Sequence, residues 1–383
     1  MLYSLTQYLL EQTQGTEFGE WISWLRVFRY ITFRAAGATL TGLVLSLLLG
    51  RRVIAWLRRM NFGEHYESKA AQHGATDVTG GSVKRGTPTM GGLLMVGVIE
   101  VTVLLWTPVN HLVALTLLPL FGLAVLGFYD DYTKITRRSG DGVQGRVKLV
   151  AQAALGLFIA VYLWSLPETR ALIADLRVPF FKYPVLTDAA WVGGLVTVLT
   201  IMGSSNAVNL TDGLDGLAVG SMVIVAGVFI VLAYVAGHAK IAAYLQVPYI
   251  PGAGELTVVC AALVGAGLGF LWFNCYPAEV FMGDTGSLAL GGVLGIIAVL
   301  IHQPLVLVIA GGVFVLEALS VVLQVGYFKW TRRRYGAGQR LLRMAPLHYH
   351  FLKLGWPESR VTTRFYILGF VFGVAALATL KLR

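Results

Sequence analysis

Acidic and amide side chains recur at the ends of apolar stretches in this 383-residue chain. The stretch NAVNLTDGLDGLA, residues 206–218, carries Asn206, Asn209, Asp212 and Asp215 between two apolar runs. Carboxylate and amide oxygens suit hard cations such as Mg²⁺, and a carboxylate can also accept a proton during catalysis. These four residues are therefore the first candidates for a functional site.

Four other segments carry acidic, amide, basic or histidine side chains that could take part in the same site. They are LGFYDDYTK with Asp130 and Asp131, WFNCYPAEVFMGDTGS with Asn274, Glu279 and Asp284, KRGTPTMGG with Lys84 and Arg85, and APLHYHF with His348 and His350. Of two adjacent carboxylates, one can bind a metal ion while its neighbour handles a proton. A set rich in oxygen ligands and poor in histidine favours Mg²⁺ and phosphate-bearing substrates. No GxxxxGK[ST] sequence occurs, so a P-loop nucleotidase is not indicated.

Each segment also has a purely structural interpretation. Asp284 could cap the helix that follows it, and Thr211 or Asp212 could cap the next apolar helix, because Asp and Thr are preferred at helix N-termini. Asp130 and Asp131 could form a solvated helix end that pairs with Lys134. For each segment taken alone, both interpretations stay open.

Long apolar stretches must position these residues. Hydrophobic residues make up 56% of the chain and charged residues 13%, with a mean hydropathy of +0.70, unlike a soluble domain. Because about 20 apolar residues cross the hydrocarbon core of a bilayer, we expect an all-α integral membrane protein with about ten transmembrane helices in a single domain, residues 1–383. The expected spans are 33–50, 90–107, 111–129, 147–165, 190–205, 215–237, 256–274, 285–302, 305–327 and 361–380.

The distribution of Lys and Arg sets the expected topology. Ten spans place residues 51–89, 130–148 and 329–364 on one side, and these segments carry 21 of the 30 Lys and Arg residues. By the positive-inside rule this side is cytoplasmic, so both termini are expected on the periplasmic side. All the candidate segments then share the cytoplasmic face, which favours an active site there.

Other sequence features narrow the function classes. In a membrane protein a net charge of +10 indicates contact with anionic lipid or phosphate, and no nucleic acid is expected. Cys260 and Cys275 have no metal-ligand spacing, and the first fifteen residues lack the features of a cleaved signal peptide. Residues 20–34 mix aromatics with Arg, as either an interfacial helix or the end of the first span would. The polar loop 61–83 has no assigned role.

Taken together, the motifs resemble those of a known family. KRGTPTMGG, GFYDDYTK, NAVNLTDGLDGLA, FNCYPAEVFMGDTGSLALGG, and PLHYHF followed by GWPESRV are similar, in order, to the motifs of the phospho-N-acetylmuramoyl-pentapeptide-transferase family, from about residue 35 to the C-terminus. That family acts in the bacterial inner membrane. It transfers phospho-MurNAc-pentapeptide from UDP-MurNAc-pentapeptide to undecaprenyl phosphate, requires Mg²⁺ and releases UMP. The resemblance implies the same activity and partners here, and a homodimer.

The resemblance also implies roles for single residues. It makes Asp284 the principal Mg²⁺ ligand, Asp130 the base that deprotonates the lipid phosphate, and Asp131 a second group at the metal or the nucleotide. Lys84 is the fourth catalytic residue, and Lys84 and Thr89 form the phosphate-side group. The substrate-binding residues implied by the same motifs are Thr89, Asn206, Asn209, Asp212, Asp215, Asn274, His348 and His350.

The chain departs from the family at the late histidine motif, and two alternatives follow. The family has three consecutive histidines, then an aromatic residue and Glu, whereas this chain has Tyr349 and Leu352 at the second and last of these positions. Tyrosine can donate a hydrogen bond but cannot become cationic, which keeps open a relative that transfers GlcNAc-1-phosphate to a polyprenyl phosphate. A secondary transporter is the other alternative, because Glu100 and Glu317 lie inside apolar spans.

Overall fold

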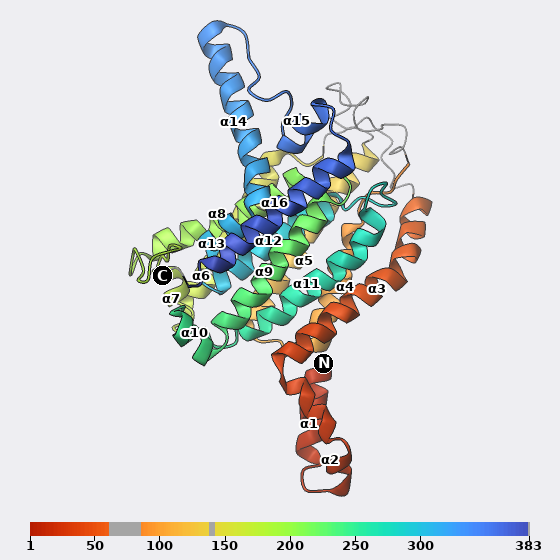
Figure 1. Ribbon diagram of the computed structural model, residues 1–383, viewed down its shortest axis with the longest axis vertical. Helices are drawn as coiled ribbons and strands as arrows, with labels where there is room; N and C mark the ends of the chain where they lie inside the picture. The colour runs from red at the N-terminus through yellow and green to blue at the C-terminus, as the bar shows by residue number, and fades with distance from the viewer. Residues whose placement is uncertain (61–85, 138–141, 382–383) are drawn as a thin grey trace.

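The chain folds into a bundle of helices (Figure 1). The structure is a computed structural model that describes residues 1–60, 86–137 and 142–381, and apart from isolated bridge pairing the described residues form helices and turns. The helices are α1 (Leu2–Gln12), α2 (Glu17–Trp21), the 3₁₀ helix η1 (Ser23–Arg29), α3 (Ile31–Arg59), α4 (Gly92–Trp106), α5 (His111–Thr136), α6 (Gly145–Ser165), α7 (Ala171–Ala174), α8 (Ala190–Thr211), α9 (Leu217–Ala236), α10 (Ala239–Leu245), α11 (Gly254–Asn274), α12 (Gly283–Leu300), α13 (Pro304–Ala310), α14 (Gly312–Tyr335), α15 (Leu347–Lys353) and α16 (Glu358–Ala378).

The expectation of an all-α integral membrane protein is confirmed. In the described part of the chain, nine helices are long and apolar enough to cross a membrane, namely α3, α5, α6, α8, α9, α11, α12, α14 and α16. The second expected span, 90–107, is the shorter helix α4, which has 15 residues. At a rise of about 1.5 Å per residue, α4 is about 22 Å long and covers most of a bilayer core.

The ninth expected span, 305–327, differs from the structure in its interior and at its end. The helix breaks at Gly311 into α13 and α14, and α14 continues to Tyr335. A Cβ at Gly312 would collide with the ring of Phe372 of α16, so the close approach of α16 requires a glycine beside the break. Beyond this point α14 rises out of the bundle (Figure 1).

Helix α12 forms the centre of the bundle. Every residue from Thr285 to Leu300 is buried. Small residues let neighbouring backbones approach it closely, as is usual between membrane helices. A Cβ at Gly92 of α4 would strike the backbone of Gly286, and a Cβ at Gly127 of α5 would strike the carbonyl of Asp284. These contacts fix the height at which α4 and α5 meet the start of α12.

Met1 and Leu380, near the two ends of the described chain, lie at the end of the bundle opposite the start of α12. The Met1 amino group donates to the carbonyl of Leu104 at 2.6 Å, near the link from α4 to α5. Leu380 packs on the apolar cluster formed by α9, α10 and the link to α11. The side chain of Asn110, between α4 and α5, donates to the Gly252 carbonyl at 3.1 Å and ties these two links together. Met1 and Leu380 therefore lie at the same end of the bundle.

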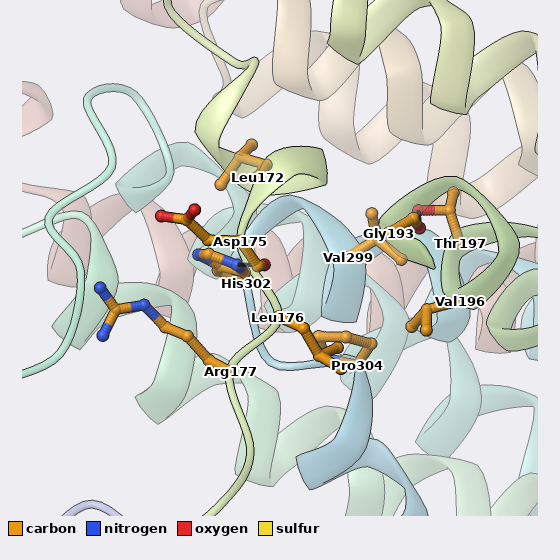
Figure 2. Close-up of a pocket in the computed structure, with 10 residues that line it drawn as sticks. All are labelled: Leu172, Asp175, Leu176, Arg177, Gly193, Val196, Thr197, Val299, His302 and Pro304. Carbon is orange, nitrogen blue, oxygen red and sulfur yellow. Dashed lines mark hydrogen bonds between the residues drawn. The ribbon is translucent and has the colours of Figure 1, made fainter. Parts of the chain in front are cut away.

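The segment 20–34, for which the sequence left two interpretations open, is divided between elements. Residues Ser23–Arg29 form η1, and α3 begins only at Ile31. Arg34 is buried in α3 and pairs with Glu255 of α11 at 2.5 Å. A small cavity at the same end of the bundle is lined by Asp175, Arg177 and His302 (Figure 2), and the His302 ring contacts the Asp175 carbonyl at 2.7 Å. These contacts close the end of the bundle that the candidate site does not use.

Candidate active site

Three carboxylates from two helices meet at the start of α12. Asp130 and Asp131 lie in the last two turns of α5, and Asp284 lies in the first turn of α12. One oxygen from each lies within 4.8 Å of the others. Asp130 is 0% exposed and Asp131 is 4% exposed, so the solvated helix end considered from the sequence is wrong, although the pairing with Lys134 is confirmed. We call these residues the carboxylate cluster.

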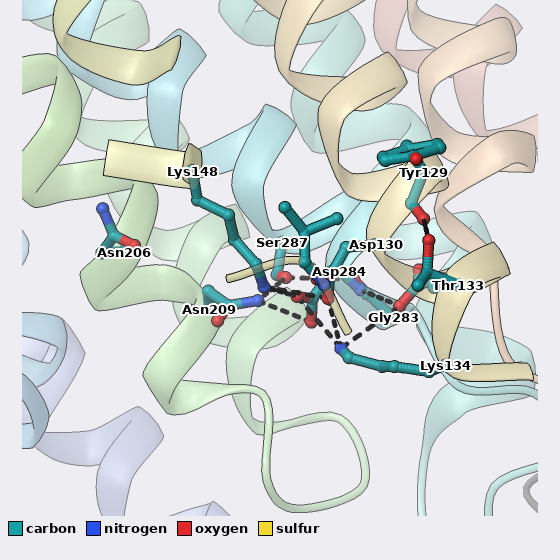
Figure 3. Close-up of polar contacts among 12 residues, drawn as sticks. Tyr129, Asp130, Thr133, Lys134, Lys148, Asn206, Asn209, Gly283, Asp284 and Ser287 are labelled. Atoms are coloured by element: carbon teal, nitrogen blue, oxygen red, sulfur yellow. Dashed lines mark hydrogen bonds and ion pairs between the residues drawn. The ribbon is translucent and has the colours of Figure 1, made fainter. Parts of the chain in front are cut away.

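Two lysines bridge the carboxylate cluster (Figure 3). Lys134 Nζ lies 2.6 Å from Asp130 Oδ2 and 3.1 Å from Asp284 Oδ2. Lys148 Nζ, from the first turn of α6, lies 2.9 Å from Asp130 Oδ2 and 2.8 Å from Asp284 Oδ2. With three carboxylates and two ammonium groups the ionised site is close to neutral overall, so it keeps positive groups where anionic phosphates could bind.

The Asp131 side chain accepts hydrogen bonds from the start of α12. Its Oδ1 accepts a hydrogen bond from the Asp284 backbone N–H at 3.1 Å. Its Oδ2 accepts from the Thr285 N–H at 3.0 Å and from the Thr285 hydroxyl at 2.8 Å. The first backbone N–H groups of a helix have no partner within the helix, and a carboxylate there is also favoured by the helix dipole. Asp131 therefore holds the backbone from which Asp284 projects.

This arrangement corrects the structural interpretation of Asp284 and Asp212. The N-cap residue of α12 is Met282, whose side chain makes no capping hydrogen bond, and Asp284 faces the lysines instead. The N-cap residue of α9 is Gly216, in a left-handed conformation, while Asp212 follows the last turn of α8. Neither aspartate caps the helix that follows it.

Asn209 joins the carboxylate cluster from α8. Its side-chain amide donates to Asp284 Oδ1 at 2.9 Å and to the Ser287 hydroxyl at 2.8 Å. Asn206, one turn earlier, points away from the cluster (Figure 3). It donates to Gln152 Oε1 of α6 at 2.6 Å and to the Met202 carbonyl at 2.7 Å. The structure thus brings Asn209 into the site and uses Asn206 to join α6 and α8.

The segment before α4 packs directly on the start of α12. Gly91 N–H donates to the Phe281 carbonyl at 2.9 Å, and Gly92 N–H donates to the Met282 carbonyl at 2.8 Å. Thr89 is buried here, and a Cβ added to Gly283 would lie 2.9 Å from its hydroxyl and 2.6 Å from Asp131 Oδ2. Thr89 therefore lies beside the carboxylate cluster, as expected of a site residue. Lys84, the other candidate from this motif, lies outside the described residues.

The loop of residues 212–216 forms a second group of candidate residues. Asp215 is buried, its Oδ2 accepts from the Ala278 N–H at 3.1 Å, and its backbone N–H donates to Glu358 of α16 at 2.9 Å. The Asn274 side chain accepts from the Gly216 N–H at 3.2 Å and donates to the Val280 carbonyl at 2.8 Å. The Tyr366 hydroxyl donates to the Gly216 carbonyl at 2.7 Å. Asp215 and Asn274 thus fix the shape of this loop.

The altered histidine motif contacts the same loop. His348 is fully buried, and its backbone N–H and ring Nδ1 each lie 3.2 Å from an oxygen of Glu317. A Cβ on Gly213 would collide with the His348 ring, and the Tyr349 hydroxyl donates to the Gly213 carbonyl at 3.3 Å. His350 instead accepts from the Arg343 N–H at 3.1 Å. Glu317, an intramembrane acid in the sequence, is therefore paired with the motif.

Sequence reasoning missed four polar residues. From the sequence, Lys134 was considered only as a partner at a helix end, and Lys148 only as one of the charges that set the topology. Glu358 and Tyr366 were not considered as site residues. The spacing of Lys134, three and four residues after the adjacent aspartates, is a usable signal for one helix face. Lys148 reaches the cluster from another helix, so no spacing within a motif reveals it.

The carboxylate cluster has the composition of a site for a divalent cation. Three carboxylates with converging oxygens are hard ligands, and Mg²⁺ is bound in proteins through one or two carboxylates together with water and substrate phosphate. Asp284 offers the more accessible oxygens, since its side chain is 16% exposed and that of Asp131 is 5% exposed. The donor set therefore fits Mg²⁺.

An apolar groove lies between α8, α13 and α14. It has a volume of about 410 Å³. Its lining includes Leu199, Gly203, Ala207, Val208, Leu294, Leu305, Val308, Phe314, Val315 and Leu319. Ala207 and Val208 directly precede Asn209, whose amide contacts Asp284. The groove therefore reaches the turn of α8 that carries Asn209.

Comparison with known proteins agrees with the sequence motifs. The model of glycosyl transferase family 4 matches residues 113–302. The phospho-N-acetylmuramoyl-pentapeptide-transferase of Methylacidiphilum infernorum is 49% identical over 366 residues, which cover 94% of this chain and 96% of that protein. Proteins of the same name from Nitratidesulfovibrio vulgaris and Oleidesulfovibrio alaskensis are 50% and 48% identical, over 94% of this chain and 97% and 96% of theirs.

Proposed function

This chain belongs to the phospho-N-acetylmuramoyl-pentapeptide-transferase family, and from that membership we propose that it makes the first lipid-linked intermediate of peptidoglycan synthesis. An oxygen of undecaprenyl phosphate forms a bond to the phosphorus that carries MurNAc-pentapeptide in UDP-MurNAc-pentapeptide. The diphosphate P–O bond of the donor breaks, and UMP leaves. The observation that carries the proposal is the buried carboxylate cluster with its two lysines, in a chain related to these enzymes over nearly its whole length.

We propose that the two lysines hold the phosphates of the substrates. Each ammonium group now contacts Asp130 and Asp284 at 2.6–3.1 Å. A phosphate oxygen can replace a carboxylate oxygen as the partner of such a group without leaving the ammonium charge unpaired. Lys134 and Lys148 would thereby stabilise the charge on the transferring phosphoryl group. Lys84 is proposed to act on the phosphates from the loop before α4.

Asp130 is the proposed base for the lipid phosphate. One of its oxygens accepts from the Val143 N–H at 2.7 Å and the other contacts both lysines. When the lysines turn to phosphate oxygens, this second oxygen becomes free to accept the proton of the acceptor phosphate. Both oxygens of Asp131 accept hydrogen bonds from the backbone and the Thr285 side chain of α12, which supports Asp130 as the group that transfers the proton.

Mg²⁺ is proposed to bind at Asp284, with Asp131 as a second ligand. A bound Mg²⁺ would neutralise charge on the donor diphosphate. The chain's own part is to aim Asp284, because Asp131 holds its backbone and Asn209 holds its Oδ1.

The acceptor lipid is proposed to lie in the apolar groove. An extended polyprenyl chain needs a long apolar surface, and the groove offers one between membrane helices. The groove reaches the turn of α8 that carries Asn209, so a chain lying in it could extend its phosphate toward Asp284. The soluble donor would reach the same point from the loop 212–216, through Asp212, Asp215 and the histidine motif. The family resemblance also supports a bacterial inner-membrane protein with periplasmic termini, and a homodimer.

The runner-up is a transferase of GlcNAc-1-phosphate, which the altered histidine motif kept open. The test is UMP release by the detergent-purified protein with undecaprenyl phosphate and Mg²⁺, with UDP-MurNAc-pentapeptide compared with UDP-GlcNAc. Turnover with the muramoyl donor alone supports the proposal, and turnover only with UDP-GlcNAc would replace it by the runner-up. Asp284→Asn serves as the control for catalysis at this site.

A further inference from the structure

The last turns of α14 and the segment that follows them form a basic projection, which we call the basic arm (residues 324–343). From Ala318 to Pro357 the sequence contains no Asp or Glu. Six basic residues lie in the arm and are all exposed, namely Lys329, Arg332, Arg333, Arg334, Arg340 and Arg343. Figure 1 shows the arm standing clear of the bundle, on the side of α15. The carboxylate cluster and the groove do not include these residues.

The basic arm has a fixed shape. Gln324 Oε1 accepts from the backbone N–H groups of Leu341 and Leu342 at 3.1 and 2.8 Å, and the Thr331 hydroxyl accepts from Gln339 N–H at 2.8 Å. Gly336, at φ +76°, ends the helix in the left-handed conformation that suits glycine. The returning segment is thus tied to the helix in two places, so its cations are held in position before any partner arrives.

The exposed surface of α14 changes its chemistry along the helix. Leu316, Leu319 and Val322 are 37%, 48% and 64% exposed, on the part that crosses the membrane. Trp330 follows at 56% exposed, and the three consecutive arginines come next. Apolar, aromatic and then cationic residues in this order are typical of a helix that passes from hydrocarbon through the interface to the lipid headgroups.

From these observations we infer that the basic arm binds the phosphates of anionic phospholipid headgroups in the leaflet that borders the active site. The helix dipole favours cations in the last turn of α14, but it does not account for Lys329 or Arg340, which lie outside that turn. Anionic headgroups match both the charge of the arm and its height above the apolar stripe. The inference does not depend on the proposed reaction.

The experiment measures the lipid next to Trp330 in the full-length protein. The protein is reconstituted in phosphatidylcholine bilayers that contain brominated phosphatidylglycerol or brominated phosphatidylcholine, and tryptophan quenching gives the relative association constant of the two lipids. The difference between wild type and Trp330→Phe isolates the signal of the arm. Each basic side chain at an anionic surface contributes about a fivefold preference. We therefore expect at least about a fivefold preference for phosphatidylglycerol in wild type, and its loss in the triple variant Arg332→Gln, Arg333→Gln, Arg334→Gln.

A matched control removes three arginines elsewhere on the same side. Arg51, Arg52 and Arg58 are exposed on the last turns of α3, and their replacement by Gln should leave the signal of Trp330 unchanged. Equal quenching by both lipids in wild type, or an equal loss in the α3 control, would overturn the inference. Displacement of phosphatidylglycerol by free UDP would overturn it too, and would assign the arm to the soluble donor.

Discussion

Replacing Asp131 by Asn should destabilise the protein far more than replacing its neighbour Asp130. Asp131 is 4% exposed and accepts three hydrogen bonds, at 3.1, 3.0 and 2.8 Å, from the first turn of α12. An asparagine keeps one acceptor oxygen and turns its NH₂ group toward donors. The asparagine oxygen can take the place of Oδ2 and keep both bonds from Thr285, which leaves its NH₂ group facing the Asp284 N–H. A hydrogen bond to a charged group is worth about 1.5–3 kcal/mol and one to a neutral group about 1 kcal/mol. Losing one charged bond and weakening two others therefore costs about 3–5 kcal/mol.

Asp130→Asn loses less because its partners have substitutes. Its single backbone donor, Val143 N–H, can still bond to the asparagine oxygen, and both lysines keep Asp284 within 3.1 Å. We expect a loss of about 1–2 kcal/mol. Both variants should lose transferase activity, so activity alone does not separate them.

The assay is thermal unfolding of each purified variant in one detergent, followed by tryptophan fluorescence at a fixed scan rate. Asp131→Asn should unfold about 5 °C or more below Asp130→Asn. Thr285→Val, which removes only the hydroxyl donor at 2.8 Å, should fall between wild type and Asp131→Asn. Equal unfolding temperatures for the two Asp variants, or a lower one for Asp130→Asn, would refute the assignment of Asp131 to the start of α12.

Three further predictions concern the same region. Asp284→Asn should lower UMP release about 100-fold or more with little change in unfolding temperature, and full activity at ordinary Mg²⁺ concentration would contradict its role. Lys148→Met should tighten the binding of Mn²⁺, measured by electron paramagnetic resonance, about tenfold, because Lys148 Nζ competes for Asp284 Oδ2 at 2.8 Å. Gly92→Ala should destabilise the protein by about 1–3 kcal/mol through collision with Gly286, whereas Gly97→Ala, which has open space on the same helix, should not lower the unfolding temperature.

The sequence predicted the helices well because the length of an apolar run reflects the thickness of the bilayer. It did not predict the break between α13 and α14, since Gly311 lies in a run that is apolar on both sides, and the contact of Phe372 with Gly312 comes from a distant helix. It also placed the start of the second span too early. Residues 88–91 bond to Phe281 and lie outside α4, and this pairing depends on a distant segment.

For the site, the expected topology predicted which segments meet but not which side chains contact one another. An even number of spans was enough to bring Asp130, Asp131 and Asp284 to one end of the bundle. The separation of Asn206 from Asn209 was not predictable, because residues three apart share a helix face and only the position of α6 draws Asn206 away. The contribution of Lys148 likewise depends on how α6 is placed beside α12.

The central position of α12 has a consequence for how the protein can evolve under an inhibitor. Gly286, Gly291, Gly292 and Gly295 each touch a neighbouring helix so closely that an added Cβ would collide with backbone or with a packed side chain. A substitution there would disturb the bundle as a whole and not just one binding contact. We expect inhibitor-resistant variants to be rare on α12 and to arise on more exposed elements that border the site, such as the start of α6. Resistance to a compound that contacts mainly α12 should therefore arise through few substitutions.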